Sequence, residues 1–129
     1  MNEQDPLLAP IEGAARKTVG GVIMDVVPAG AARVTRTIYG PGFRWKTHMQ
    51  QAVKTDICLH THVGFLARGH IHVQFPDGCS REWTAPAVVV LEAGHHGWVI
   101  GDEPAVLIEV DFMGETAKRF GLPGVHTHD

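Results

Sequence analysis

Histidines are the residues of this chain whose number and placement could support chemistry. The chain has 9 of them in 129 residues, and several fall in two stretches, 41–69 and 94–104. The histidines of these two stretches are His48, His60, His62, His95 and His96. Neutral imidazole is the commonest protein ligand for transition metals, and a rigid β scaffold can aim several imidazoles at one point. The pattern predicts a site for a divalent transition metal.

Side-chain alternation separates the candidate ligands from surface histidines. In the segment 70–75, apolar residues alternate with His70 and His72, so we expect these two to face solvent. His126 and His128 lie near the end of the chain and are also expected at the surface. Four histidines of the chain are therefore set aside.

The remaining histidines can share one interior. His60 and His62 lie on the same face of a predicted strand as Cys58. His95 and His96 are adjacent, so only one of them can point inward. A hydrogen-bonded polar interior without metal is the alternative for all of these residues.

Short apolar segments separated by glycine, proline or Asp-Gly predict an antiparallel β-protein. The predicted strands are 22–27, 32–39, 43–49, 58–67, 70–75, 81–84, 87–91, 96–100 and 105–112. In 32–39 we expect Val34 and Ile38 to face inward, and we expect 87–91 to be buried on both faces. Asp77 and Gly78 are expected to form a two-residue hairpin turn with positive φ at both positions.

One barrel domain accounts for most of the chain. Residues 1–20 are predicted to form a loose N-terminal arm, with one helical turn at 12–17. Residues 21–114 form the predicted barrel, and 115–129 form a short helix and tail. A chain of this length can bury a core of its own.

Composition narrows the class of partners. A net charge of −3 and a pI of 6.3 leave no basic stripe, so nucleic acid is not an expected partner. No apolar run is long enough to span a bilayer, and the N-terminus lacks the features of a secretory signal. The 2 cysteines are too few for a disulfide scaffold. A soluble cytoplasmic protein is expected, without membrane partners.

The segments HTHVGFLARG and LEAGHHGWVIGDEP resemble the motifs of the cupin superfamily, in particular its small single-domain members of the conserved-barrel type. The resemblance covers about residues 32–112, and the second segment is its most specific part. It implies an all-β fold, a cupin-like double-stranded β-helix or jelly-roll barrel with a short C-terminal helix added here. It also implies a divalent metal in the barrel and, commonly, a homodimer.

Some ligand positions of the family carry a histidine in this chain, and others carry a different residue. By resemblance, His48 takes the place of the first histidine of motif one, and Gln50 stands where a second would be. His62 occupies the position of the usual glutamate. His95 lies about two residues before the usual histidine of motif two, whose place is taken by Gly97.

If His48, His62 and His95 converge, three imidazoles leave one coordination position open, as in catalytic metal sites. His60 or Cys58 could supply a fourth ligand. This ligand set suits zinc, nickel, iron or copper and disfavours calcium. We therefore assign the metal to His48, His60, His62 and His95.

Other residues are predicted to shape the site. Trp45, Trp98, Cys58 and Gln50 are expected to line the pocket around a small-molecule ligand. Glu92 is a candidate to orient a ligand histidine. The structural alternative for Cys58 and the two tryptophans is core packing.

Three functions fit these observations: a metal-dependent enzyme acting on a small molecule, a non-catalytic small-molecule-binding or sensing barrel without a required metal, and a barrel with a vestigial site.

The apolar faces of 63–65 and 105–112 exceed what one interior needs, so a homodimer with twofold symmetry is expected.

Overall fold

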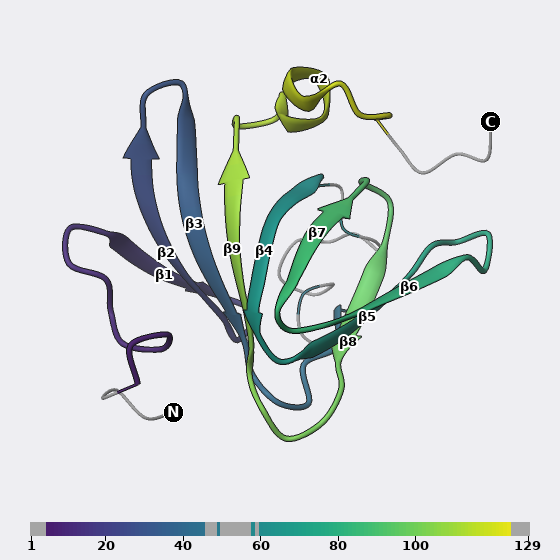
Figure 1. Cartoon of the computed structure of the whole chain (residues 1–129), viewed down its shortest axis with the longest axis horizontal. Coiled ribbons are helices and arrows are strands. Elements are labelled where there is room, and N and C mark those ends of the chain that lie inside the picture. The colour runs from purple at the N-terminus through teal and green to yellow at the C-terminus, as the bar shows by residue number, and fades with distance from the viewer. Residues whose placement is uncertain (1–4, 46–48, 50–57, 59, 125–129) are drawn as a thin grey trace.

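The computed structural model describes residues 5–45, 49, 58 and 60–124. Its elements form two antiparallel sheets and a short helix (Figure 1). The strands are β1 (Ala15–Val19), β2 (Val22–Ala29), β3 (Ala32–Tyr39), β4 (His62–Arg68), β5 (His70–Gln74), β6 (Ser80–Thr84), β7 (Ala87–Leu91), β8 (His96–Val99) and β9 (Ala105–Asp111). The helix is α2 (Thr116–Phe120), close to the predicted one.

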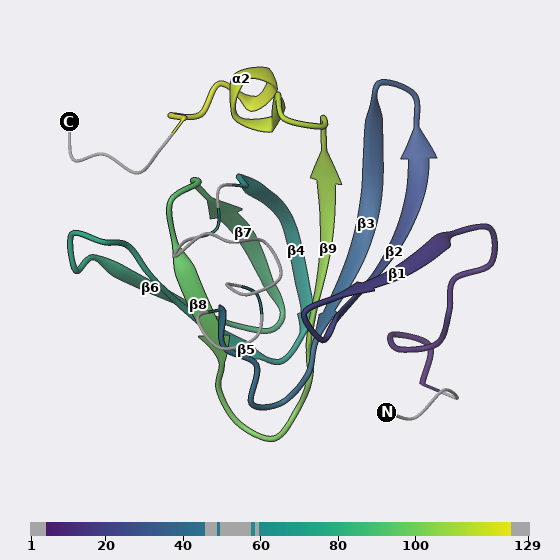
Figure 2. The ribbon, with the colours of Figure 1, turned by 180° about the vertical axis from the view of Figure 1, so that it is seen from behind.

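The sheets are unequal in size. The large sheet has the strand order β1-β2-β3-β9-β4-β7, and the small sheet has the order β6-β5-β8. Seen from behind, the small sheet lies beside the β4-β7 end of the large one, and β1 and β2 extend away at the other end (Figure 2). The two layers enclose the main core, which includes Leu66, Val73, Val89 and Leu107.

The prediction of a helical turn at 12–17 was wrong, because the strand β1 begins at Ala15. Gly20 and Gly21 have φ values of 57° and 81°. Positive φ at both central residues makes the two-residue turn that matches the twist of a hairpin. β1 therefore folds back on β2, with Val19 opposite Val22.

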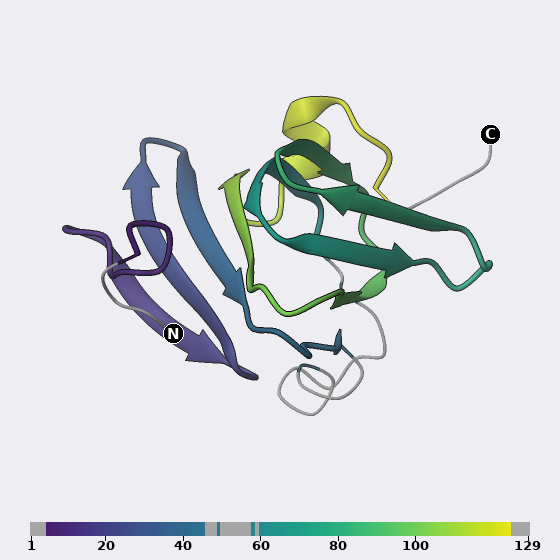
Figure 3. The ribbon, with the colours of Figure 1, turned by 60° about the horizontal axis from the view of Figure 1, so that its bottom comes forward.

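The segment before β1 is docked on the sheet, so its described residues do not form the loose arm we expected. Leu8 is buried against Ile38 and Val106 on the outer face of the large sheet. Buried Arg36 on β3 donates hydrogen bonds to the carbonyl oxygens of Pro6 and Ala9. Figure 3 shows this segment lying against the strands that follow it.

The docked segment reverses the predicted orientation of β3. Ile38 is buried, but on the outer face under Leu8, and Val34 is exposed. Thr35, Thr37 and Tyr39 line the interior instead. The prediction assumed that the apolar residues of a strand face the barrel interior, whereas here the chain covers the outer face as well.

Apolar side chains on β4 and β7 form an exposed patch. Phe65 stands opposite Val88, and Val63 stands opposite Val90. Phe65 is 45% exposed and Val88 is 70% exposed, so the expectation that 87–91 is buried on both faces was wrong. We call these four residues the outer apolar face.

Two other predicted details change. The turn after β5 uses positive φ only at Gly78 (91°), because the chain turns over residues 76–78 and the Gly78 N–H bonds to the Phe75 carbonyl. The predicted strand 58–67 begins only at His62, while Cys58 forms an isolated bridge with His95. Of the predicted strand 43–49, Arg44 bridges Trp98 and residues 46–48 lie outside the described part.

Within the part of the chain that the structure describes, we find no helical segment whose length and hydrophobicity would let it span a bilayer.

Candidate metal centre and cavity

A cavity of about 520 Å³ lies in the barrel and is lined by both sheets. Most of its wall is apolar, with residues such as Met24, Leu91 and Leu107 from the large sheet and Ile71 and Val73 from the small one. The volume is in the range of small-molecule sites. Three side chains with metal-binding atoms gather in its wall.

These side chains are Cys58, His62 and His95, whose ligand atoms all lie within 4.8 Å of one another. Cys58 is 4% exposed and His95 is 5% exposed. The isolated bridge between Cys58 and His95 holds the first and third together, and His62 is the first residue of β4. The cluster therefore forms where the loop before β4 meets the loop before β8.

Glu109 on β9 orients His62. The Nδ1 atom of His62 lies 2.7 Å from Oε1 of Glu109, and its Nε2 atom lies 3.4 Å from Sγ of Cys58. Burial alone lowers the pKa of His62, but the charges of Glu109 and Cys58 raise this pKa well above its usual value. In the absence of metal, His62 is thus favoured as an imidazolium between two anionic partners.

A backbone carbonyl orients His95. Nδ1 of His95 lies 2.8 Å from the carbonyl oxygen of Glu92, to which it donates, and Nε2 therefore stays available as a ligand atom. We expected the Glu92 carboxylate in this orienting role. That carboxylate instead pairs with Arg81, at 2.7 Å, so only its backbone serves the site.

The same surroundings favour a thiolate at Cys58. Burial raises the pKa of this thiol, yet the charge of His62 and hydrogen bonds with His60, His62 and His95 bring the pKa well below its usual value. Thiolate and neutral imidazole are the ligand forms that zinc and its neighbours bind.

The spacing of the Cys58 and His62 ligand atoms also fits a metal. Usual Zn–S and Zn–N bond lengths in a tetrahedral site place the two ligand atoms about 3.6 Å apart. The distance of 3.4 Å between Cys58 Sγ and His62 Nε2 is close to that value. One thiolate and two imidazoles leave a fourth position for a ligand from the cavity.

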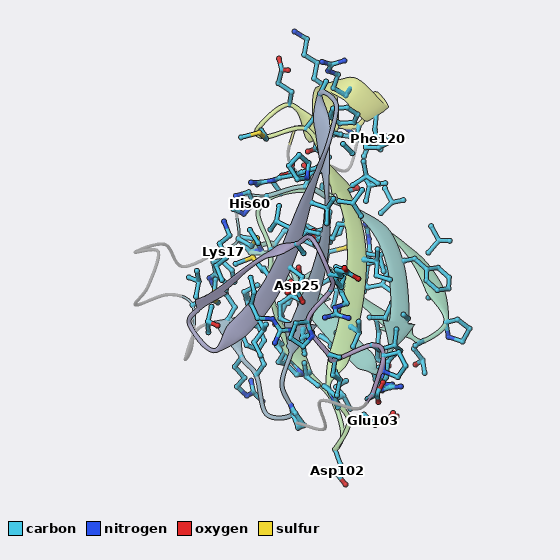
Figure 4. All side chains as sticks on the ribbon, turned by 90° about the vertical axis from the view of Figure 1, so that its left-hand side faces the viewer. Lys17, Asp25, His60, Asp102, Glu103 and Phe120 are labelled. Atoms are coloured by element: carbon cyan, nitrogen blue, oxygen red, sulfur yellow. The ribbon has the colours of Figure 1, made fainter. Side chains whose placement is uncertain are left out.

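Of the other predicted metal ligands, His60 is the one that the structure describes. His60 is exposed at the cavity edge, with its Nδ1 atom 3.9 Å from Cys58 Sγ, and it does not belong to the cluster. His60 lies on the same side of the molecule as Lys17, another residue of the cavity wall (Figure 4). His48 and Gln50 lie outside the described residues.

The predicted pocket residues Trp45 and Trp98 both belong to the cavity wall. The Trp98 ring also stacks on His72, at 4.6 Å between ring centroids. His70 and His72 each have a ring nitrogen 3.0 Å from a carboxylate oxygen of Glu82, and neither belongs to the metal-binding cluster. His126 and His128 lie outside the described residues.

Glu109 is the site residue that sequence reasoning missed. A local signal was present, because Glu109 is an acidic residue in the apolar strand β9 and shares the inward face with Leu107. Its pairing with His62 depends on β9 lying next to β4, which the sequence does not reveal.

Comparison with known proteins gives the fold. No family model matches this chain, and no curated protein sequence matches it. Among solved structures, a Cupin 2 conserved barrel domain protein from Salinispora arenicola matches with a TM-score of 0.54 and 18% identity, over 87% of this chain and 92% of that one. A cupin-like protein from Thermotoga maritima matches with a TM-score of 0.55 and 18% identity, over 78% of each chain.

A third similar structure is an enzyme. Hydroxypropylphosphonic acid epoxidase from S. wedmorenis, in complex with fosfomycin, matches with a TM-score of 0.53 and 10% identity, over 78% of this chain and 56% of that one. At such identities these likenesses establish the fold alone. The chain has the cupin jelly-roll barrel that its motifs predicted.

Proposed function

We propose that this small cupin-type protein binds a divalent transition metal through Cys58, His62 and His95, and binds or transforms a small molecule beside it. The observation that carries the proposal is the approach of these three ligand atoms to within 4.8 Å of one another in the cavity wall. The thiolate and imidazole set favours zinc, nickel, iron or copper over oxygen-preferring ions.

The residues of the site have separate tasks in this proposal. Glu109 holds His62 through Nδ1, and the Glu92 carbonyl holds His95 through Nδ1, so both Nε2 atoms are directed to the cluster. The apolar wall limits access of bulk water. A metal bound here supplies Lewis acidity toward a ligand oxygen, or a centre that activates oxygen.

The proposal that this protein is an enzyme goes beyond the proposal that it binds a metal and a small molecule. The likeness to an epoxidase supports it only through the fold, and folds of this kind host many functions. A binding or sensing barrel without a required metal is the second candidate. It is favoured by the chain of contacts from Cys58 to His62 to Glu109, in which each polar group already has a partner within the protein.

Cobalt binding tests the metal site. Untagged protein loaded with Co(II) is expected to display the near-ultraviolet charge-transfer absorption of a thiolate ligand. Cys58→Ser should remove this band and weaken binding, whereas the matched control Cys79→Ser should retain it, because Cys79 lies outside the cluster. Cobalt binding without a band, or the same band in the Cys58→Ser protein, would refute the ligand set.

Turnover separates the enzyme from the binding barrel. Consumption of a candidate substrate in proportion to metal content supports the enzyme. Ligand-induced increases in melting temperature that persist after metal removal, without consumption, support the binding barrel.

We also propose a cytoplasmic location. Cys58 and Cys79 are both free thiols, which persist in reducing compartments.

A further inference from the structure

The loop between β7 and β8 carries His95 and is held from two sides. On one side, the backbone amides of Gly94 and His95 donate hydrogen bonds to the carbonyl oxygen of Cys58, at 2.7 and 3.3 Å. On the other side, Arg81 of β6 reaches the loop at Glu92. Cys58 is itself a member of the metal-binding cluster, whereas Arg81 belongs neither to the cluster nor to the cavity wall. Arg81 can therefore be changed without removal of a ligand atom.

Arg81 binds the Glu92 carboxylate through both terminal nitrogens of its guanidinium. Nη1 of Arg81 lies 2.7 Å from Oε2 of Glu92, and Nη2 lies 3.0 Å from Oε1. Two parallel N–H···O bonds fix the direction of a carboxylate as well as its position. The pair therefore restrains the residue whose backbone carbonyl accepts a hydrogen bond from Nδ1 of His95, at 2.8 Å.

A second route leads from Arg81 to His95 through Phe75. The guanidinium carbon of Arg81 lies 5.4 Å from the centre of the Phe75 ring. That ring meets the His95 ring at 6.3 Å between centroids and 80° between planes. Phe75 is 2% exposed, and a side chain packed in the core has little room to move. Arg81 thus restrains His95 through the backbone of Glu92 and through the Phe75 ring.

The strand order explains why a side-chain pair is needed at this point. β6 is an edge strand of the small sheet, β7 is an edge strand of the large sheet, and the two are not neighbours in either sheet. The Arg81–Glu92 pair joins β6 to the residue that follows β7. The position of His95 relative to His62, which lies on β4 of the large sheet, depends in part on this connection.

We infer that Arg81 is a positioning residue of the candidate metal centre. It holds Glu92 so that the Glu92 carbonyl keeps the proton of His95 on Nδ1, and the Nε2 atom of His95 is then presented to the other two ligands. The inference rests on the proposed function, because it names the residue that controls one of the three proposed ligands from outside the cavity.

The tautomer of His95 in the metal-free protein is the first readout. Arg81→Met removes the guanidinium and keeps an unbranched apolar side chain. We expect His95 to carry its proton on Nδ1 in the unmodified protein, and to divide it between Nδ1 and Nε2 in Arg81→Met. Long-range ¹H–¹⁵N NMR distinguishes the two forms, because protonated and unprotonated ring nitrogens resonate far apart. The His95 signals are assigned by their loss in His95→Gln.

Metal affinity is the second readout. In competition with a chromophoric chelator, Arg81→Met should bind Co(II) about tenfold more weakly than the unmodified protein, as expected for loss of a group that orients a ligand. Glu92→Gln keeps the backbone carbonyl and weakens the pair, so it should also lower the affinity. The double variant should lose no more affinity than Arg81→Met alone, because both changes break the same pair.

Arg119→Met is the matched control. Arg119 likewise lies over a phenylalanine ring, at 5.0 Å from the centre of Phe112, and near a glutamate, with Nε 3.8 Å from Glu115 Oε2. It belongs neither to the cluster nor to the cavity wall. The His95 tautomer and the cobalt affinity should both be unchanged in Arg119→Met.

A purely structural Arg81 would lower the melting temperature of Arg81→Met and leave the His95 tautomer unchanged. An unchanged tautomer, or a cobalt affinity equal to that of the unmodified protein, would overturn the inference. If Arg81→Met does not fold, Glu92→Gln gives the same decision by the same two readouts.

The two proposals fail in different ways. A mixed His95 tautomer in Arg81→Met supports the positioning role even where cobalt binding through Cys58 has failed. A protein that binds cobalt through Cys58, with the same affinity and the same His95 tautomer in Arg81→Met, keeps the metal site and refutes the role of Arg81.

Discussion

His62 and Glu109 are 47 positions apart in the chain, and their side chains meet at 2.7 Å between Nδ1 and Oε1. They meet because β4 pairs with β9, where Gly64 stands opposite Glu109. A carboxylate on the far nitrogen of an imidazole fixes the ring and raises its basicity as a ligand. Glu109 therefore orients one of the three residues of the candidate metal centre.

Glu109→Gln should weaken metal binding by about 10- to 100-fold, because an amide orients His62 less firmly and carries no charge. Competition titration against a chromophoric chelator measures the affinity. Glu115→Gln is the control, since Glu115 is exposed near α2 and should bind metal as the unmodified protein does. Equal affinities for the two variants would contradict a role for Glu109.

Gly97→His should not restore a histidine to the position where the cupin motif carries one. A Cβ atom at Gly97 would lie 2.7 Å from the His72 carbonyl oxygen and 3.0 Å from Val73 Cγ1. We expect a loss of stability of about 1–3 kcal/mol in urea unfolding, as for other overpacked sites, and no gain in metal affinity. Gly40→Ala is the control, because no atom lies within 4 Å of its Cβ position. A stable Gly97→His protein that binds metal more tightly would refute this account.

The stability that Asp25 contributes to the fold should be lost in acid. Its carboxylate accepts from Arg16 and from buried Arg36, and the hydrogen bond from Arg16 is the largest cause of its lowered pKa. A lowered folded-state pKa contributes stability that is present above the unfolded-state value of 3.8 and is lost as pH falls through the folded-state value. Melting temperature should therefore fall as pH drops below about 4.

Asp25→Asn isolates this contribution. At neutral pH it should cost about 3–5 kcal/mol, because it leaves the Arg36 guanidinium buried without its carboxylate. The remaining acid dependence of stability should be weaker than in the unmodified protein. Asp102→Asn, in an exposed turn, serves as the control and should change neither property. An unchanged acid profile in Asp25→Asn would exclude Asp25 as the cause.

The homodimer stays a prediction, and the outer apolar face, with Val88 70% exposed, is its candidate contact. Val88→Lys should shift the protein from dimer to monomer in analytical ultracentrifugation, because a charge in an apolar contact must be desolvated. Thr84→Lys places the same charge on β6 and should leave the dimer intact. A monomeric unmodified protein at micromolar concentration would contradict the prediction.

The sequence by itself determined most strands and the fold family. Alternation, glycine at turns and the GDEP-containing segment are local signals, and they predicted β3 and β7 at the bounds they have. The same signals singled out His62 and His95, because histidines on strands near turns stand out from their neighbours. Local patterns also gave one wrong element. Residues 12–17 were predicted to form a helical turn, but the hairpin turn at Gly20 and Gly21 pairs this part of the chain with β2 instead.

Only the tertiary structure decided which faces and partners those residues have. Ile38 points away from the barrel because the N-terminal segment covers the outer face of the sheet. The residue pattern of β3 alone does not show that another segment packs on this face. Cys58 joins His62 and His95 rather than remaining a core residue, because two loops meet there. Glu109 reaches His62 because β9 lies between β3 and β4. Contacts between distant segments depend on strand order, which local side-chain patterns do not specify.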